Sequence, residues 1–296
     1  MDVLRSVMYT PGNNEKLIES GKKLRPDVLV LDLEDSVPLQ EVAKAREMSS
    51  KAVPSLKEAT GSLIYSRVHD WRTGMTEADL DKIIIPGLDG IVLAKTEGAA
   101  DVYLMENRLT QLENERGLKV GSIRMQCLIE TARGLVLAHE AAAASRRINS
   151  LVFGQVDFTR DMLTIISPNS TDVARSWTAI AARSAGLIPI DAPYPGFRDV
   201  EGFKKDTAYG REMGYLGRML IHPNQIEPSH EVYSPRKEQI DYAKEVVEMF
   251  EDAMKKGLAS VPLRDSMIDI AVYRREKDVL SRYQDIQRAE SQKKPL

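Results

Sequence analysis

Short apolar runs recur along the chain, each with a polar or charged residue near its end. The runs span residues 4–9, 27–33, 63–68, 90–94, 123–129, 150–153, 187–190 and 217–221, and the residues near their ends are Thr10, Glu34, Arg67, Lys95, Glu130, Asp157, Asp191 and His222. The runs are rich in Val, Ile and Leu and mostly continuous, which is typical of parallel strands covered on both faces. This pattern predicts eight buried strands with polar groups gathered at their carboxyl ends.

Helical patterns lie between these runs. They span residues 14–24, 39–52, 99–114, 134–144, 172–185 and 202–213, and the second is expected to end before Pro54. Gly186 and Gly214 stand where two of them should end, as glycine commonly does. Strands that alternate with helices indicate right-handed βαβ units. The predicted fold class is α/β, a (β/α)8 TIM barrel with a C-terminal extension, and a doubly wound open sheet is the alternative.

The predicted barrel domain covers residues 1–257, with residues 235–256 as its eighth helix. Apolar residues at Ile240, Ala243, Val247 and Phe250 give that helix one apolar face. Residues 258–296 then form an extension, which is too long to remain unpacked. We expect it to pack on a neighbouring subunit.

Composition excludes some classes of protein. The 296 residues are 43% apolar and 29% charged with a net charge of −3, so nothing favours binding to nucleic acid. Cys127, the one cysteine, cannot form an intrachain disulfide and is expected in the core. The first residues lack a signal-peptide pattern, and no apolar stretch approaches the roughly 18 residues that span a bilayer. We expect a cytoplasmic protein without membrane contact.

Two carboxylates close neighbouring predicted strands. Glu130 follows the run at 123–129, and Asp157 follows the run at 150–153. Mg²⁺ prefers oxygen ligands and often takes one or two carboxylates, leaving other positions to water and substrate. The pair therefore predicts a magnesium site. Acids are also common in the first turn of a helix, so each residue could instead begin the following helix.

Three acids end the second strand, and an arginine ends the third. Strand alternation sends Asp32 and Glu34 to one face and Leu33 and Asp35 to the other. We interpret Glu34 and Asp35 as groups around metal-bound water or as partners of Arg67. The Arg67 guanidinium can grip a carboxylate or an enolate with two parallel hydrogen bonds, or serve as a structural ion pair.

A turn after the first strand offers an anion site. It leads into a helix that carries several lysines, and helix N-termini attract anions. A plain connecting loop is the alternative for this turn. The residues concerned are Pro11, Gly12, Asn13, Asn14, Lys16 and Lys22.

Together these motifs resemble those of one family. The chain resembles the citrate lyase beta-subunit-like proteins of the HpcH/HpaI aldolase superfamily, which include malyl-CoA and citramalyl-CoA lyases. Two positions depart from the usual pattern, namely Ser266, where a glycine is frequent, and Ala94 before Lys95, where a proline is frequent. The matching segments are RSVMYTPGN at 5–13, LDLEDSV at 31–37, LIETARG at 128–134, FGQVDF at 153–158 and IHPNQI at 221–226.

The resemblance implies a site as well as a fold. It implies a TIM barrel that forms homotrimers or multiples of them, with Mg²⁺ held by Glu130 and Asp157 and with Arg67 binding substrate. It implies that residues 11–14 and the nearby lysines receive the coenzyme A nucleotide. It also implies that Asp269, in the segment Met267-Ile268-Asp269, acts as an acid/base in the active site of a neighbouring subunit.

The implied function is that of a Mg²⁺-dependent carbon–carbon lyase. It would cleave or form a 3-hydroxyacyl-CoA such as citramalyl-CoA or malyl-CoA, giving acetyl-CoA and a 2-oxo acid, pyruvate or glyoxylate. Three alternatives stay open. They are a metal-dependent aldolase on free 2-oxo acids, a citrate lyase beta subunit acting on a carrier-bound citryl thioester, and a non-catalytic barrel subunit.

Overall fold

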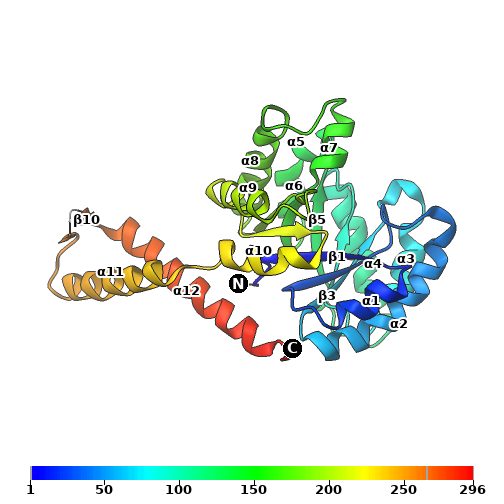
Figure 1. Cartoon of the computed structure of the whole chain (residues 1–296), viewed down its shortest axis with the longest axis horizontal. Helices are drawn as coiled ribbons and strands as arrows, with labels where there is room; N and C mark the ends of the chain where they lie inside the picture. The colour runs from blue at the N-terminus through cyan, green and yellow to red at the C-terminus, as the bar shows by residue number, and fades with distance from the viewer. Residues whose placement is uncertain (1, 265, 296) are drawn as a thin grey trace. The chain divides into compact units, whose positions relative to one another are not determined.

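A closed barrel forms the larger part of the computed structural model, which describes residues 2–264 and 266–295. Within those residues eight parallel strands close in chain order, and β1 pairs with both β2 and β8 (Figure 1). The predicted α/β class and (β/α)8 TIM barrel are confirmed. The strands are β1 (Ser6–Pro11), β2 (Val28–Asp32), β3 (Leu63–Val68), β4 (Gly90–Leu93), β5 (Arg124–Ile129), β6 (Ile148–Phe153), β7 (Ile188–Asp191) and β8 (Gly217–Leu220).

Helices connect these strands around the outside of the barrel (Figure 1). Local sequence explains several of their ends. Pro168 begins α8 without losing a hydrogen bond, and Gly186 follows that helix with a φ of 73°, which glycine adopts at little cost. The helices are α1 (Glu15–Gly21), α2 (Val42–Thr60), α3 (Thr76–Ile83), α4 (Ala99–Glu115), α5 (Ala132–Val136), α6 (Ala138–Ala143), α7 (Gln155–Asp161), α8 (Pro168–Ser184), α9 (Val200–Glu212) and α10 (Ile226–Tyr233).

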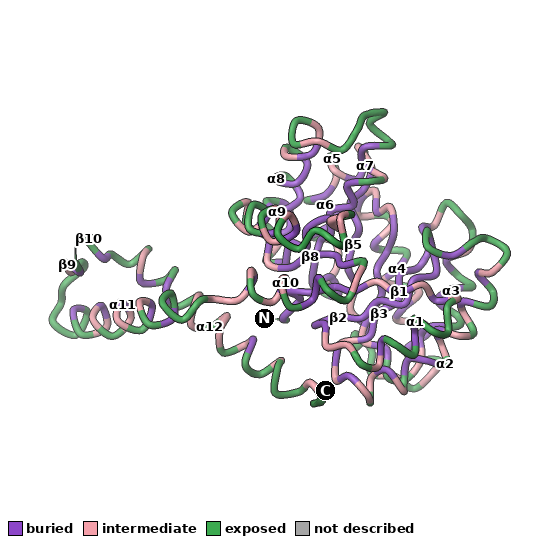
Figure 2. Tube along the Cα trace, in the orientation of Figure 1, coloured by how far each residue is buried: buried purple, intermediate pink, exposed green. Residues whose placement is uncertain are grey.

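Alternation along the strands builds two cores. One set of side chains fills the barrel and includes Val7, Val30, Tyr65, Val92, Leu128 and Ile190. The other set packs against the helices and includes Leu29, Ile64, Leu93, Cys127 and Leu151. The barrel strands are accordingly buried along most of their length (Figure 2). Because inward positions recur every second residue, the interior set continues toward the carboxyl ends at Tyr9, Asp32, Arg67 and Glu130.

The main departures from the predicted elements lie in the helices. The helix predicted for residues 39–52 runs through Pro54 to Thr60 as α2. Proline removes one helical hydrogen bond, but the fully buried Val53 and Leu56 hold the helix against the core on both sides of it. The helix predicted for residues 134–144 is divided at Leu137 into α5 and α6. The short helices α3, α7 and α10 were not predicted.

The extension belongs to a second compact unit, which comprises Tyr233–Gln292 together with Asp2 and Val3. The predicted barrel domain ends at residue 257, whereas α11 (Lys237–Lys255) packs with α12 (Ile270–Gln292) and is grouped with the extension. Between them lies an antiparallel hairpin of β9 (Val261–Leu263) and β10 (Ser266–Ile268). A small core fills the unit, formed by Val246, Phe250, Leu263, Ile268 and Tyr273. Packing of the extension on a neighbouring subunit stays a prediction.

The residues after α12 rejoin the barrel unit. Lys293 Nζ lies 2.7 Å from Asp27 Oδ1, and Arg25 Nε donates to the carbonyl oxygen of Lys294 at 2.6 Å. Asp27 is also bound by Arg5 through both of its carboxylate oxygens. Burial alone would raise the pKa of Asp27, but Arg5 and Lys293 hold it well below its ordinary value. Lys293 is thus held by a buried ion cluster.

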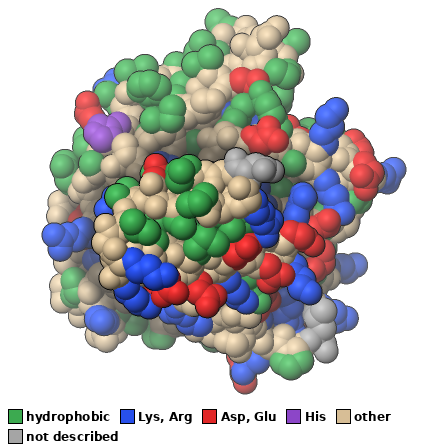
Figure 3. All heavy atoms as spheres, turned by 90° about the vertical axis from the view of Figure 1, so that its left-hand side faces the viewer, with side chains coloured by type: hydrophobic (Ala, Val, Ile, Leu, Met, Phe, Trp, Pro, Cys, Tyr) green, Lys and Arg blue, Asp and Glu red, His purple; other side chains and the backbone are tan. Residues whose placement is uncertain are grey.

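The surface carries charges of both signs. Basic and acidic side chains are intermixed on the face that Figure 3 views, as a net charge near zero would suggest. Apolar side chains are exposed on the extension, Met267 to 62% and Leu258 to 51%. None of the described helices is both long enough and apolar enough to cross a bilayer.

Candidate active site

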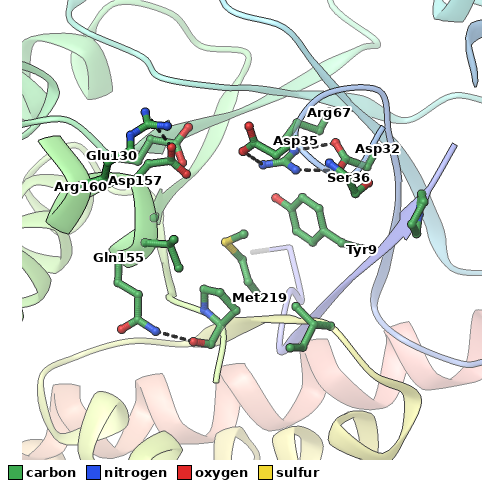
Figure 4. Close-up of a pocket in the computed structure, with 15 residues that line it drawn as sticks. Tyr9, Asp32, Asp35, Ser36, Arg67, Glu130, Gln155, Asp157, Arg160 and Met219 are labelled. Atoms are coloured by element: carbon green, nitrogen blue, oxygen red, sulfur yellow. Dashed lines mark hydrogen bonds and ion pairs between the residues drawn. The ribbon is translucent and has the colours of Figure 1, made fainter. Parts of the chain in front are cut away.

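A cavity of about 510 Å³ opens at the carboxyl ends of the barrel strands. Charged side chains line one part of it, whereas Val156, Pro193, Met219 and Ile221 give the rest an apolar wall (Figure 4). This is the end of the barrel at which TIM-barrel enzymes carry their chemistry. Its polar and charged lining residues are Tyr9, Asp32, Asp35, Ser36, Arg67, Glu130, Gln155, Asp157 and Arg160.

Glu130 follows β5 directly and is almost completely buried, with 2% of its surface exposed. Its Oε1 accepts a hydrogen bond from the backbone nitrogen of Lys95 at 2.9 Å. Gly154 leaves the space for this carboxyl group, because a Cβ there would stand 2.5 Å from Glu130 Oε2. Burial raises the pKa of Glu130 to about 8. A carboxyl group held in this way needs a cation before it ionises readily.

Asp157 lies beside Glu130 (Figure 4). It does not close a strand, because β6 ends at Phe153 and Asp157 occupies the first turn of α7. Its Oδ1 pairs with Arg160 Nη2 at 3.0 Å, and the Arg160 side chain is 70% exposed. Asp157 therefore belongs to the first turn of a helix and also lines the cavity, so both predictions for this residue apply. The exposed Arg160 can move away from this carboxylate at little cost.

Arg67 is already gripped by an acid of the neighbouring strand. Its Nε and Nη2 each donate to one oxygen of Asp32 at 2.6 Å, an arrangement set by the pairing of β2 with β3. Ser36 Oγ also donates to Asp32, at 2.5 Å. Burial opposes ionisation of Asp32, but the Arg67 guanidinium holds its pKa below the ordinary value. The two parallel hydrogen bonds that Arg67 was expected to make to a ligand are thus made to Asp32. The third guanidinium nitrogen, Nη1, faces the other acids.

Glu34 and Asp35 both approach Arg67, as one of the two interpretations of them predicted. Arg67 Nη1 lies 3.0 Å from Glu34 Oε2 and 3.2 Å from Asp35 Oδ2. Glu34 is buried and is also bonded to Lys95 Nζ, whereas the Asp35 side chain is 47% exposed. Burial raises the pKa of Glu34 despite the nearby guanidinium. Asp35 is therefore the partner that a ligand can displace most easily.

Lys95 links two of these acids. Its backbone nitrogen bonds Glu130, its Nζ bonds Glu34, and it has a φ of 45°, which is rare for residues other than glycine. Burial opposes the charge on Lys95, but Glu34 raises its pKa above the ordinary value. Backbone strain of this kind persists where the surrounding contacts hold it, often at functional sites.

The charges of this cluster do not balance. Five acids, Asp32, Glu34, Asp35, Glu130 and Asp157, face three basic residues, Arg67, Lys95 and Arg160, so full ionisation would leave a charge of −2. Glu130 and Asp157 both offer the oxygen ligands that Mg²⁺ prefers, and a divalent cation held by them would offset that excess. The described residues hold no group of three or more His, Cys, Asp or Glu arranged to bind a metal.

Most of the residues predicted to receive coenzyme A make hydrogen bonds or ion pairs with other residues of the protein. Asn14 caps α1 by accepting from Leu17 N at 3.1 Å, and Asn13 Nδ2 donates to Glu41 at 2.8 Å. Gly12 N donates to the Asp32 carbonyl at 2.8 Å, and Lys22 pairs with Glu19 at 2.7 Å. Pro11 lines the cavity, and Lys16 is exposed.

Asp269 lies in the extension, immediately before α12. Its Oδ1 accepts hydrogen bonds from the backbone nitrogens of Ala271 at 2.9 Å and Val272 at 3.0 Å, and its side chain is exposed. It is therefore a helix cap within its own unit. Its role as an acid/base in a neighbouring subunit stays a prediction.

Three residues that shape this cavity had no predicted role in the site, although Asp32 was noted among the acids that follow the second strand. Tyr9 lines the cavity, Asp32 orients Arg67, and Arg160 pairs with Asp157. Strand alternation gave a signal for Tyr9 and Asp32, because both lie at inward positions. Two residues named in the strand pattern lie elsewhere. Asp191 is buried in an ion pair with Arg175, and His222 stacks on Phe197 with ring centroids 5.0 Å apart.

Comparison with known proteins gives matches over most of the chain. Residues 5–223 match the protein family described as HpcH/HpaI aldolase/citrate lyase. The citrate lyase subunit beta of Haemophilus influenzae is 32% identical over 286 residues, which is 95% of this chain and 97% of the relative. The (3S)-malyl-CoA thioesterase of Cereibacter sphaeroides (strain KD131) is 31% identical over 255 residues, which is 86% of this chain and 85% of the relative.

A solved structure supports the same fold. The protein CitE of Mycobacterium tuberculosis, in complex with magnesium, acetoacetate and coenzyme A, superposes with a TM-score of 0.72. The superposition covers 94% of this chain and 97% of the CitE chain, at 24% sequence identity.

Proposed function

The chain belongs to the HpcH/HpaI aldolase/citrate lyase family, and from this premise we propose that it is a Mg²⁺-dependent carbon–carbon lyase. Its substrate is a 3-hydroxyacyl-CoA such as citramalyl-CoA or malyl-CoA. Cleavage gives acetyl-CoA and a 2-oxo acid, pyruvate or glyoxylate. The active assembly is a homo-oligomer, a trimer or a multiple of one.

One observation carries the proposal, namely the buried Glu130 carboxyl group beside Asp157 in a cavity that also contains Arg67. Glu130 and Asp157 are the residues that would hold Mg²⁺. The bound ion would lower the pKa of a substrate hydroxyl and offset negative charge on its oxygen. The magnesium, acetoacetate and coenzyme A of the Mycobacterium tuberculosis relative support this chemistry.

The side chains of the barrel would bind and orient the reacting carbons. Asp32 fixes the plane of the Arg67 guanidinium through two hydrogen bonds, so that Nη1 is left to Glu34 and to the exposed Asp35, which a ligand can replace. There Nη1 offsets charge on the oxygen of the departing 2-oxo acid. The substrate hydroxyl group gives its proton to water and becomes a carbonyl, and its carbon loses its bond to the α-carbon of the thioester. The exposed Asp35 gives way to that ligand. The bonding electrons pass to the thioester as an enolate.

Proton transfer completes the reaction. Asp269 of a neighbouring subunit donates a proton to the enolate carbon in cleavage and removes one in condensation. The coenzyme A nucleotide lies near Pro11, Gly12, Asn13, Asn14, Lys16 and Lys22. The Cereibacter sphaeroides relative, named as a malyl-CoA thioesterase, supports a coenzyme A thioester as the substrate class.

A citryl thioester on a carrier protein is the second candidate substrate. The Haemophilus influenzae relative, named as a citrate lyase subunit beta, matches this chain over nearly its full length and favours that possibility.

A screen separates the two candidate substrate classes. Citramalyl-CoA, malyl-CoA and a carrier-bound citryl thioester are each incubated with enzyme and Mg²⁺, and the 2-oxo acid and acetyl thioester are measured. The proposal requires release from a coenzyme A substrate, and release from the carrier substrate alone would replace it.

The proposed site has a defined dependence on pH. Glu130 must lose its proton to bind Mg²⁺, and its pKa is about 8. Protons therefore compete with the ion below that pH, and the apparent dissociation constant for Mg²⁺ should fall about tenfold from pH 6 to pH 7. This dissociation constant is obtained by measuring the melting temperature at increasing MgCl₂ concentrations and at several pH values. An Mg²⁺ affinity that does not change between pH 6 and pH 8 would contradict the assignment of Glu130.

The role of Asp269 in a neighbouring subunit is testable by mixing two inactive variants. Co-refolded Asp269→Ala and Glu130→Ala chains should recover activity, because some sites then combine an intact Glu130 with an intact Asp269 from another chain. Random mixing leaves about one quarter of the sites complete. Each variant refolded alone is the control. Without recovery, Asp269 acts on its own barrel or takes no part.

A further inference from the structure

Tyr9 is a polar residue of the cavity to which the proposed function gives no role. It lies on β1, and its side chain packs on the interior core and lines the cavity next to Arg67 (Figure 4). Its hydroxyl oxygen is buried and has no hydrogen-bond partner among the residues that the structure describes. The Arg67 guanidinium stands 5.3 Å from the centre of its ring.

A buried hydroxyl group without a partner is costly. Burying such a group without a hydrogen-bond partner costs about 1–3 kcal/mol. Most buried polar groups in proteins therefore have a partner. The contrast within this barrel is direct, because the hydroxyl group of Tyr65 accepts a hydrogen bond from Asn149 Nδ2 at 2.9 Å. Tyr9 therefore has a donor and an acceptor position left for a ligand or for water in the cavity.

The proton on Tyr9 and the nearby Arg67 suit an anionic oxygen as that partner. Burial raises the pKa of Tyr9 above its ordinary value, and Asp32, Glu34 and Glu130 act in the same direction against Arg67. The hydroxyl group thus keeps its proton at neutral pH and acts as a donor. The oxygens of Asp32 are already bound by Arg67 and Ser36. Tyr9 and Arg67 Nη1 are then two donors on one side of the cavity.

We propose that the Tyr9 hydroxyl group binds a carboxylate oxygen of the 2-oxo acid, beside Arg67, and so selects substrates that carry this carboxylate. The inference rests on the proposed function. It makes Tyr9 a substrate-binding residue, and it makes recognition of the acid depend on a hydrogen bond as well as on charge. A site that hydrogen-bonds its ligand discriminates strongly against analogues that lack the group.

The test is the binding of pyruvate in the presence of saturating Mg²⁺, measured by calorimetry. Tyr9→Phe should weaken binding about tenfold to a hundredfold, as expected for the loss of a hydrogen bond to a charged group. The same variant should keep or raise the melting temperature of the free protein, because it removes an unsatisfied buried group. Tyr65→Phe is the matched control and should lower the melting temperature while leaving pyruvate binding unchanged.

The outcomes separate this inference from the proposed function. Unchanged pyruvate binding by Tyr9→Phe, with wild-type protein binding normally, overturns the role of Tyr9 and leaves the lyase proposal standing. A lower melting temperature with unchanged affinity means that the hydroxyl group is structural and also overturns it. Wild-type protein that binds neither pyruvate nor glyoxylate with Mg²⁺ overturns both proposals.

Discussion

Glu130→Gln should lower Mg²⁺-dependent turnover at least about a thousandfold, since metal catalysis supplies several kcal/mol of charge stabilisation. An amide can still coordinate through oxygen, but it brings no charge to a site whose acids would exceed its bases by two. The variant should also lose the Mg²⁺-dependent rise in melting temperature. Steady-state kinetics and thermal unfolding with and without MgCl₂ measure both effects.

The same variant should make the metal-free protein more stable. The pKa of Glu130 is raised from 4.5 to about 8, so the folded state holds a proton that the unfolded state releases between these values. The contribution of Glu130 to stability is therefore complete below pH 4.5 and is lost as the pH rises to about 8. At pH 7 the loss is roughly 3 kcal/mol, which glutamine avoids because it does not titrate.

Glu113→Gln is the matched control for this prediction. Glu113 is also fully buried, but Arg147 and the backbone nitrogens of Gly121 and Ile123 bind its carboxylate. Despite its burial, these bonds hold the pKa of Glu113 below the ordinary value. Glu113→Gln should therefore destabilise the protein and leave the turnover of folded enzyme unchanged. Metal-free Glu130→Gln that melts below wild type at pH 8 would contradict the account of Glu130.

Arg67→Ala should lower turnover about a hundredfold or more, which is the usual effect of removing one donor that stabilises transition-state charge. It should also destabilise the fold. Asp32 is buried and ionised through this guanidinium, and removal of one partner from a buried ion pair costs about 3–5 kcal/mol. The ion pair with Asp32 thus adds a cost in stability to the loss of turnover.

The double variant Asp32→Asn with Arg67→Ala separates the two effects. Loss of the unpaired acid should restore much of the stability, whereas turnover should stay low because the cavity still lacks the guanidinium. Denaturant unfolding and kcat measured on folded protein give the two quantities. Arg67→Lys adds a test of geometry, since lysine keeps the charge but cannot make the paired bonds to Asp32. Turnover near the wild-type value in any of these variants would remove Arg67 from the reaction.

Much of the fold was predictable because each strand carries its own signal. A buried parallel strand reads as a continuous apolar run, and all eight runs correspond to strands whose ends differ by at most two residues from those predicted. No local signal in the sequence shows which residues of two neighbouring strands stand side by side. Asp32 meets Arg67 because β2 and β3 pair in one register, which depends on closure of the whole barrel.

The acids of the site were visible in the sequence, but their environments were not. Glu130 and Asp157 both belong to the cavity, yet the space that Gly154 leaves for Glu130 depends on contacts between separate strands. The domain boundary was missed for a similar reason. An amphipathic helix shows that it has a partner without showing which one, and the partner of α11 is α12.

The ion pair between Asp27 and Lys293 joins residues 266 positions apart. A ribosome makes the chain from its N-terminus, so the barrel strands leave it before Lys293 has been synthesised. The buried acid has Arg5 beside it during that time but lacks its second cation. Full stability of the barrel is therefore reached only after Lys293 has been synthesised and has left the ribosome.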